Sequence, residues 1–111
     1  MKEMTEVFKM STLELIGYKS SLLDELAGKK EELLSKKFII TEKESKLLLE
    51  TDFKELKLTN EKMRTAYVNN ELLTEKKEVE SLKLEISKIE NQIIIIDDIV
   101  NLLNLMNFKG E

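Results

Sequence analysis

The stretch that decides the fold spans residues 79–103 and reads VESLKLEISKIENQIIIIDDIVNLL. Its apolar residues recur at alternating spacings of three and four, which is the heptad pattern of a coiled-coil helix. Position a holds Val79, Ile86, Ile93 and Val100, and position d holds Leu82, Ile89, Ile96 and Leu103. Such a stripe must be covered, so the rest of the chain has to supply or share the covering surface.

A second apolar stripe begins near Ile93 and lies about 100° around the same helix. Its members are spaced by four, three and four: Ile95, Ile99, Leu102 and Met106. A helix with two stripes needs at least two partners, and a helical hairpin supplies only one. We therefore predict a homo-oligomer, a dimer or larger, whose interface is formed by Ile93, Ile95, Ile96, Ile99, Val100, Leu102, Leu103 and Met106.

The composition favours helix throughout the chain. Its 111 residues include no proline and three glycines, and 36% of them are charged. Proline-free chains of this kind form long helices rather than the turns of a β-fold. We predict an all-α protein with helix over more than about three quarters of its residues. Its fold class is a long antiparallel helical hairpin, a coiled coil that assembles into an oligomeric helical bundle.

One domain is expected over residues 1–111, with a helical arm at 1–50, a turn at 51–59 and a long helix at 60–107. The stripe of the arm consists of Phe8, Leu15, Leu22, Leu26, Leu33 and Ile40. Ser11 and Glu14 have capping-box spacing, so residues 1–10 either fray or form a separate turn. Thr41 and Glu44 repeat that spacing, so the helix either restarts near 38–42 or runs through it.

Several function classes are excluded by what the chain lacks. It has no histidine, no cysteine and no motif for phosphate binding or hydrolysis, so we expect no enzyme, no cofactor and no metal site. Its net charge of −4, and acids among the lysines at 29–46, argue against nucleic acid. Asp97 and Asp98, expected to face water, interrupt the most apolar window, so we expect no membrane span and a cytoplasmic location.

A polar stretch at the hairpin tip, residues 59–73, reads TNEKMRTAYVNNELL and contains the only arginine of the chain. Arginine and tyrosine are enriched in binding hot spots. We predict a partner-binding surface at the tip, formed by Asn60, Arg64, Tyr67 and Asn70. In the alternative interpretation, Asn60 only caps the last helix and Arg64 pairs with Glu61 or Glu71.

Residues 50–68, ETDFKELKLTNEKMRTAYV, precede a coiled coil rich in Glu, Lys and Ile. Together they show an acidic-aromatic turn, a Thr-Asn cap, an Arg-Ala pair one turn later and an amphipathic tail. Over about residues 47–105 the chain resembles small helical proteins encoded by phages and prophages of low-GC Gram-positive bacteria. Some small acidic phage proteins of this size block host defence nucleases, which is an analogy of size and origin.

The sequence therefore predicts a non-catalytic, phage-type interaction protein that self-associates and binds a host or phage protein. Its sharpest version is an anti-defence inhibitor, comparable to an anti-CRISPR protein, in the host bacterial cytoplasm. The alternative is an accessory factor in phage DNA metabolism that binds single-stranded nucleic acid or a recombination protein.

Overall fold

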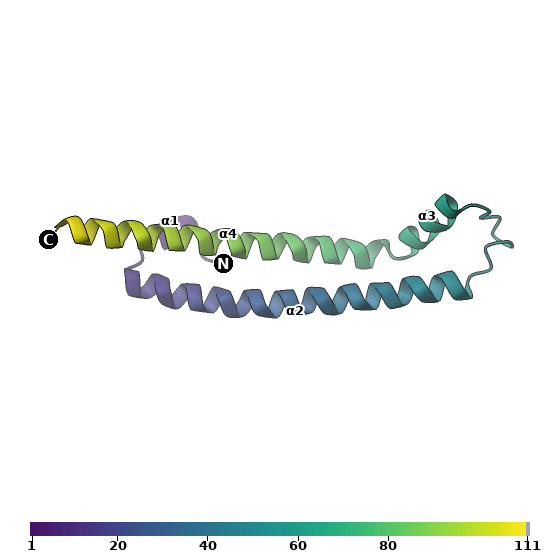
Figure 1. The fold of residues 1–111 in the computed structure, drawn as a ribbon, viewed down its shortest axis with the longest axis horizontal. Helices are drawn as coiled ribbons and strands as arrows, with labels where there is room; N and C mark the ends of the chain where they lie inside the picture. Colours follow the sequence, from purple (N-terminus) through teal and green to yellow (C-terminus); the bar gives the residue numbers. More distant parts are fainter. Residues whose placement is uncertain (111) are drawn as a thin grey trace. The chain divides into compact units, whose positions relative to one another are not determined.

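The computed structural model describes residues 1–110, with side chains through residue 107. Within this part of the chain there are four helices and no strand: α1 (Met4–Val7), α2 (Thr12–Glu50), α3 (Glu61–Glu71) and α4 (Leu73–Gly110) (Figure 1). Helices hold 83% of the residues, which confirms the all-α prediction. Over the described residues, every helix is too short or too polar to cross a membrane.

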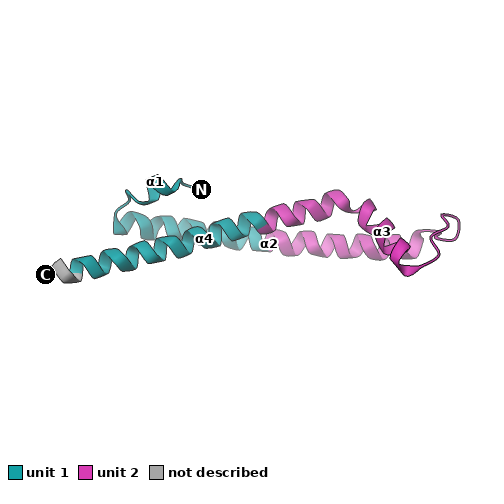
Figure 2. Cartoon of the chain, turned by 90° about the horizontal axis from the view of Figure 1, so that it is seen from above, with its two compact units in different colours: residues 1–30, 84–111 teal, residues 31–83 magenta. Residues whose placement is uncertain are grey.

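The chain contains two compact units (Figure 2). Unit 1 comprises residues 1–30 and 84–111, and unit 2 comprises residues 31–83. Helices α2 and α4 each contribute to both units. Within unit 1, Lys19 pairs with Asp97 and Lys29 pairs with Glu85, so the two helices run antiparallel. The pairs Lys36–Glu78 and Lys43–Glu75 show the same antiparallel order within unit 2.

The core of unit 1 is built from the predicted heptad stripes. Its buried residues are Val7, Leu15, Leu22, Ile89 and Ile96. Leu15 and Leu22 come from the stripe of α2, whereas Ile89 and Ile96 occupy d positions of α4. Each such side chain stabilises the fold by about 1.5–3 kcal/mol when it is fully buried.

Val7 reaches this core because the start of the chain folds back on unit 1. We call residues 1–11 the strap. The strap contains α1 and contacts both long helices, since Lys2 bonds with Tyr18 of α2 and with Gln92 of α4. Residues 1–10 thus form a separate turn of helix, which was one of the two predicted alternatives. Ser11 caps α2 as predicted, because its hydroxyl oxygen accepts the Glu14 N–H at 3.2 Å.

The core of unit 2 extends the heptad stripe of α4 upstream. Its buried residues are Ile40, Val68, Leu72 and Val79, and Leu33, Leu47 and Tyr67 pack against them. Leu72 lies seven residues before Val79, at position a, and Val68 lies at the preceding d. The d position between Leu72 and Val79 is occupied by Glu75, a charged residue, whereas the d positions before and after it hold Val68 and Leu82.

The structure decides whether α2 is continuous at 38–42, and it shows a break in the last helix that we did not predict. Helix α2 runs through 38–42 without a break, and the Thr41 hydroxyl donates to the Lys37 carbonyl at 3.0 Å. The predicted helix 60–107 is instead divided at Leu72, whose φ is −105° and ψ is 17°. The backbone N–H of Glu75 lowers the pKa of its carboxylate there, and nearby Lys43 lowers it further against the opposing effect of desolvation.

Candidate functional site

The connection between α2 and α3 is an ordered turn with a left-handed residue. Asp52 accepts the Glu55 N–H at 3.1 Å, and the Leu58 N–H donates to the Phe53 carbonyl at 2.9 Å. Lys57 has a φ of 60°, which costs a residue with a side chain roughly 1–2 kcal/mol. These bonds hold the chain in a reversal that returns it towards Asn60.

An arginine and two aromatic rings meet beside this turn, and we call Phe53, Arg64 and Tyr67 the tip cluster. The Arg64 guanidinium carbon lies 5.4 Å from the centre of the Phe53 ring. The Phe53 and Tyr67 rings meet edge to face, with centroids 6.1 Å apart and planes at 89°. Both arrangements are favourable for quadrupolar rings. The Nε–H of Arg64 also donates to the Leu58 carbonyl at 3.2 Å, so the side chain is held at two points.

The four predicted tip residues have different environments. Asn60 is the N-cap of α3, and its side-chain oxygen accepts the Met63 N–H at 2.8 Å. Arg64 is exposed but contacts Phe53 and the Leu58 carbonyl rather than Glu61 or Glu71, and Tyr67 is half-buried. Asn70 is exposed, and its side chain forms no hydrogen bond within the described residues. The structure thus brings Arg64 and Tyr67 together through Phe53, and Asn60 serves the helix end.

Phe53 is the residue of this cluster that sequence reasoning missed as a site residue. The acidic-aromatic turn was recognised, but its aromatic ring could be placed against Arg64 only with the path of the turn in hand. That path depends on Lys57, whose backbone is left-handed. A lysine in the sequence does not indicate this conformation.

The residues predicted to form an oligomer interface divide into three groups. Ile96 is 0% exposed and lies inside the core of unit 1. Four half-buried residues pack against that core: Ile93, Ile99, Val100 and Leu103. Ile95 is half-buried, whereas Leu102 and Met106 are 56% and 58% exposed. The open part of the second stripe therefore begins at Leu102, and Leu105 beside it is also exposed.

The lysines of α2 pair across the helices with the carboxylates of α4. The distances from Nζ to oxygen are 2.9 Å for Lys29–Glu85, 3.9 Å for Lys30–Glu90, 3.3 Å for Lys36–Glu78 and 3.4 Å for Lys43–Glu75. Lys19 pairs with Asp97 at 2.6 Å, so Asp97 is engaged in an ion pair as well as half-exposed to water. The stripe of α2 carries a lysine every seven residues, at Lys29, Lys36 and Lys43. The aliphatic stems of these lysines cover apolar surface, and their charged ends reach towards water. The basic charge of residues 29–43 is thus largely neutralised within the chain.

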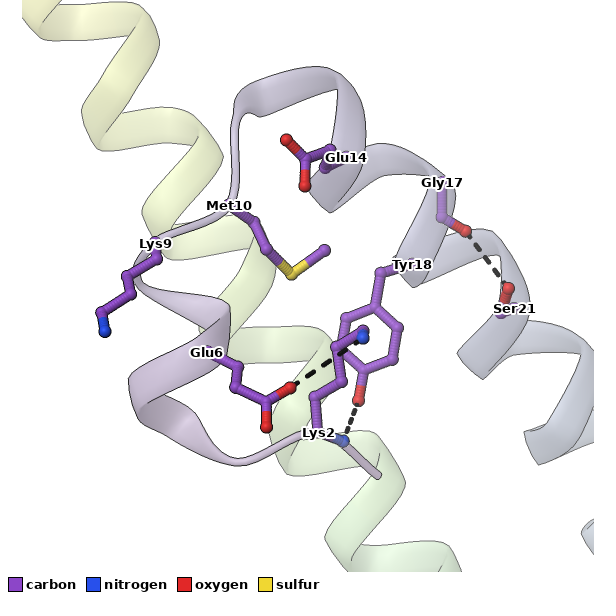
Figure 3. A pocket seen from close by; sticks show the side chains of 8 residues that line it. All are labelled: Lys2, Glu6, Lys9, Met10, Glu14, Gly17, Tyr18 and Ser21. Atoms are coloured by element: carbon purple, nitrogen blue, oxygen red, sulfur yellow. Dashed lines mark hydrogen bonds and ion pairs between the residues drawn. The ribbon is translucent and has the colours of Figure 1, made fainter.

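An open pocket lies between the strap and α2 in unit 1 (Figure 3). Its volume is about 570 Å³, and it is lined by Lys2, Glu6, Lys9, Met10, Glu14, Gly17, Tyr18 and Ser21. The side chains of Met10 and Tyr18 face the same space. A methyl group added at Gly17 would meet nothing within 4 Å. The strap therefore leaves a gap on the side that faces the first turns of α2.

Within the described residues, acidic side chains form no group of three or more that could hold a metal ion. Comparison of the chain with models of protein families, with curated proteins and with solved structures finds no match. The case for a function therefore rests on the geometry of the tip cluster and of α4.

Proposed function

We propose that this protein is a non-catalytic interaction protein, which binds a protein partner through the tip cluster and self-associates through the C-terminal part of α4. The observation that carries the first half is the Arg64 guanidinium, which is exposed and held over the ring of Phe53, the ring that Tyr67 meets edge to face. An arginine that is already positioned loses little conformational entropy when it binds.

The chemistry of this surface fits a carboxylate on an apolar protein patch. Within the described residues, the terminal nitrogens of Arg64 make no hydrogen bond, which leaves the planar fork for a bidentate acceptor. Leu56 and Met63, from the adjacent turn and helix, are 48% and 40% exposed. A charged anchor next to exposed apolar side chains is the usual composition of a protein-binding hot spot.

The ion pairs of α2 favour a protein over a nucleic acid as the partner. Binding to a phosphate backbone needs several lysines or arginines that are available to phosphates. Lys30, Lys36 and Lys43 already pair with glutamates of α4, so they offer little net charge. The single arginine of the tip cluster provides one contact, which suits recognition of a carboxylate better than a strand of phosphates.

The second half of the proposal rests on exposed apolar side chains at the end of α4. Leu102, Leu105 and Met106 are each at least half exposed and occupy neighbouring positions on the helix surface. Contiguous apolar surface on a protein of this size is a typical site of association.

The tip proposal is tested by affinity capture from a bacterial lysate, with Arg64→Ala and Tyr67→Ala compared to the parent protein. Both variants should lose most of the captured partner while their circular dichroism stays unchanged. Lys62→Ala is the matched control, because Lys62 is exposed on the same helix but lies outside the tip cluster. A partner that both variants capture as well as the parent does would refute the tip site.

Self-association is tested by sedimentation equilibrium of the parent and of Leu102→Asp over the micromolar range. The parent should be a dimer or larger, and the charged variant should dissociate without loss of helix. A parent that is monomeric over this range would contradict the proposal.

The sharper version is a phage inhibitor of a host defence complex, and it is supported by the resemblance of residues 47–105 alone. The alternative, a factor in phage DNA metabolism, predicts binding of single-stranded DNA in a shift assay at low salt. A shift that Arg64→Ala abolishes would favour the alternative, whereas capture of a defence protein through Arg64 would favour the inhibitor.

A further inference from the structure

The strap is held on unit 1 by the packing of its apolar side chains and by hydrogen bonds of Lys2. Helix α1 is a single turn of four residues, and its N-cap, Glu3, makes no side-chain capping bond. A helix of this length is unstable by itself, so tertiary contacts must hold it. Val7, which is 0% exposed, supplies the apolar contact with the core, and Met4 and Met10 pack beside it.

The polar contact is a closed ring of three hydrogen bonds. The Lys2 backbone N–H donates to the Tyr18 hydroxyl at 2.8 Å, and that hydroxyl donates to the Gln92 side-chain oxygen at 2.7 Å. The Gln92 amide nitrogen then donates to the Lys2 carbonyl at 2.8 Å. Gln92 is only 5% exposed, and it lies three residues before Ile95 on the second stripe of α4. The strap supplies the acceptor for the Gln92 amide nitrogen, whereas the Gln92 oxygen bonds with Tyr18, so the surface beneath the strap, which we call the groove, favours a docked segment with a backbone carbonyl at this point.

The same residues are also compatible with a different path of the chain. Residues 1–16 contain neither proline nor glycine, so α2 can continue backwards through the strap if it gives up the Ser11 cap, at a cost of about 1 kcal/mol. In such a helix Phe8 would fall seven residues before Leu15, on the stripe that packs in the core. In the docked strap, by contrast, Phe8 is 65% exposed. The pocket beside Met10 and Tyr18 shows that the fold-back is not tightly packed against α2 (Figure 3).

We propose that the strap exchanges between two copies of this chain. Residues 8–11 straighten into helix, and the strap of each copy docks in the groove of the other, on Tyr18 and Gln92. A second copy is the occupant that the groove fits, because it carries the same Lys2 backbone and Val7 side chain that are seated there now. Exchange of an identical element remakes the same contacts, and short connections that can straighten favour it. This inference rests on the proposed self-association and adds a site that a second copy completes.

The test uses Thr12→Pro in the full chain. Thr12 is the first residue of α2, where proline is tolerated, so the folded-back strap should be unaffected. In a straightened helix the same proline would remove the bond from residue 12 to the Phe8 carbonyl and clash with it. Thr12→Pro should therefore weaken dimerisation by about a hundredfold or more, measured by sedimentation equilibrium. Thr12→Ala is the matched control and should associate as the parent does.

Val7→Asp distinguishes exchange of the strap from a strap that only covers an association surface of α4 in its own chain. If the strap exchanges, loss of its anchor weakens association, because the strap docks in neither copy. If the strap only covers an interface of α4, Val7→Asp strengthens association and the proposal is overturned. Tyr18→Phe, which breaks the ring without placing a charge in the core, should act in the same direction as Val7→Asp and serves if that variant does not fold.

The outcomes also distinguish exchange from the proposed function. If Leu102→Asp dissociates the parent and Thr12→Pro does not, self-association through α4 stands and exchange is wrong. If Thr12→Pro dissociates it and Leu102→Asp does not, exchange stands and the α4 surface is wrong. A parent that is monomeric at all concentrations refutes both.

Discussion

Replacing Ile96 by alanine separates packing within the chain from packing between chains. The side chain is 0% exposed and belongs to the core that includes Val7, Leu15, Leu22 and Ile89. Truncation of a buried isoleucine to alanine typically costs 2–5 kcal/mol, and the full burial here places the expected loss at about 3–4 kcal/mol. Leu102 directly precedes Leu103 of the heptad stripe, but its side chain is 56% exposed. Leu102→Ala should therefore cost less than about 0.5 kcal/mol in a monomer.

The measurement is urea denaturation followed by circular dichroism, at two protein concentrations a hundredfold apart. Ile96→Ala should lose about 3–4 kcal/mol at both concentrations, because its partners belong to the same chain. If α4 self-associates as proposed, any effect of Leu102→Ala should grow with concentration, because the side chain that it contacts would belong to another chain. Equal effects of the two variants at the lower concentration would show that Ile96 does not pack as described, and the architecture of unit 1 would be wrong.

Three further predictions follow from single residues. Gly17→Ala should raise the stability of unit 1 by about 0.5–1 kcal/mol in thermal melts, because the added methyl group meets nothing within 4 Å and alanine favours helix; a loss of stability would mean that the first turns of α2 are packed on that side. Acidification should weaken unit 2: the folded-state pKa of Glu75 lies below its ordinary value, so its contribution is present above about pH 4.3 and is lost as the pH falls through the folded value. Glu75→Gln should flatten this part of the pH titration, and an unchanged titration would contradict the Glu75 contacts. Lys36→Ala should cost about 1 kcal/mol or less in denaturant titrations, since the side chains of its pair with Glu78 are still 34% and 55% exposed, and a larger loss would mean that the packing of the Lys36 stem outweighs the ion pair.

The heptad stripe could be predicted because its period alone decides which residues face a partner. Ile89 and Ile96 are buried where the spacing placed them, and Ser11 and Asn60 cap the helices that follow them. The break at Leu72 was not predictable from the period, because Leu72 and Val79 are seven residues apart and keep the same heptad phase. The break coincides with Glu75, a charged residue at the d position between Leu72 and Val79.

The candidate site shows the same limit at a turn. Arg64 and Tyr67 are three residues apart in a helix, so their shared face follows from helical spacing. Phe53 joins them across a connection whose direction is set by the Leu58–Phe53 backbone bond, the Asp52 side-chain bond to Glu55 and the left-handed Lys57. Local spacing predicts neighbours within an element, whereas contacts across an irregular turn depend on dihedral angles that the sequence leaves open.

The second stripe of α4 shows the same limit for the assembly of chains. Its spacing predicted that a hairpin partner alone would not cover the helix, and in the structure Lys2 of the strap bonds with Gln92 while Leu102 and Met106 stay exposed. Periodicity counts the surfaces that a helix must bury, but it does not say which chain provides them. Lys2 and Val7 would make the same contacts with Gln92 and the core whether they came from this copy or from a second one. Residues 8–11, the end of the strap next to α2, would have to straighten for exchange, so Thr12→Pro is the substitution that tests it.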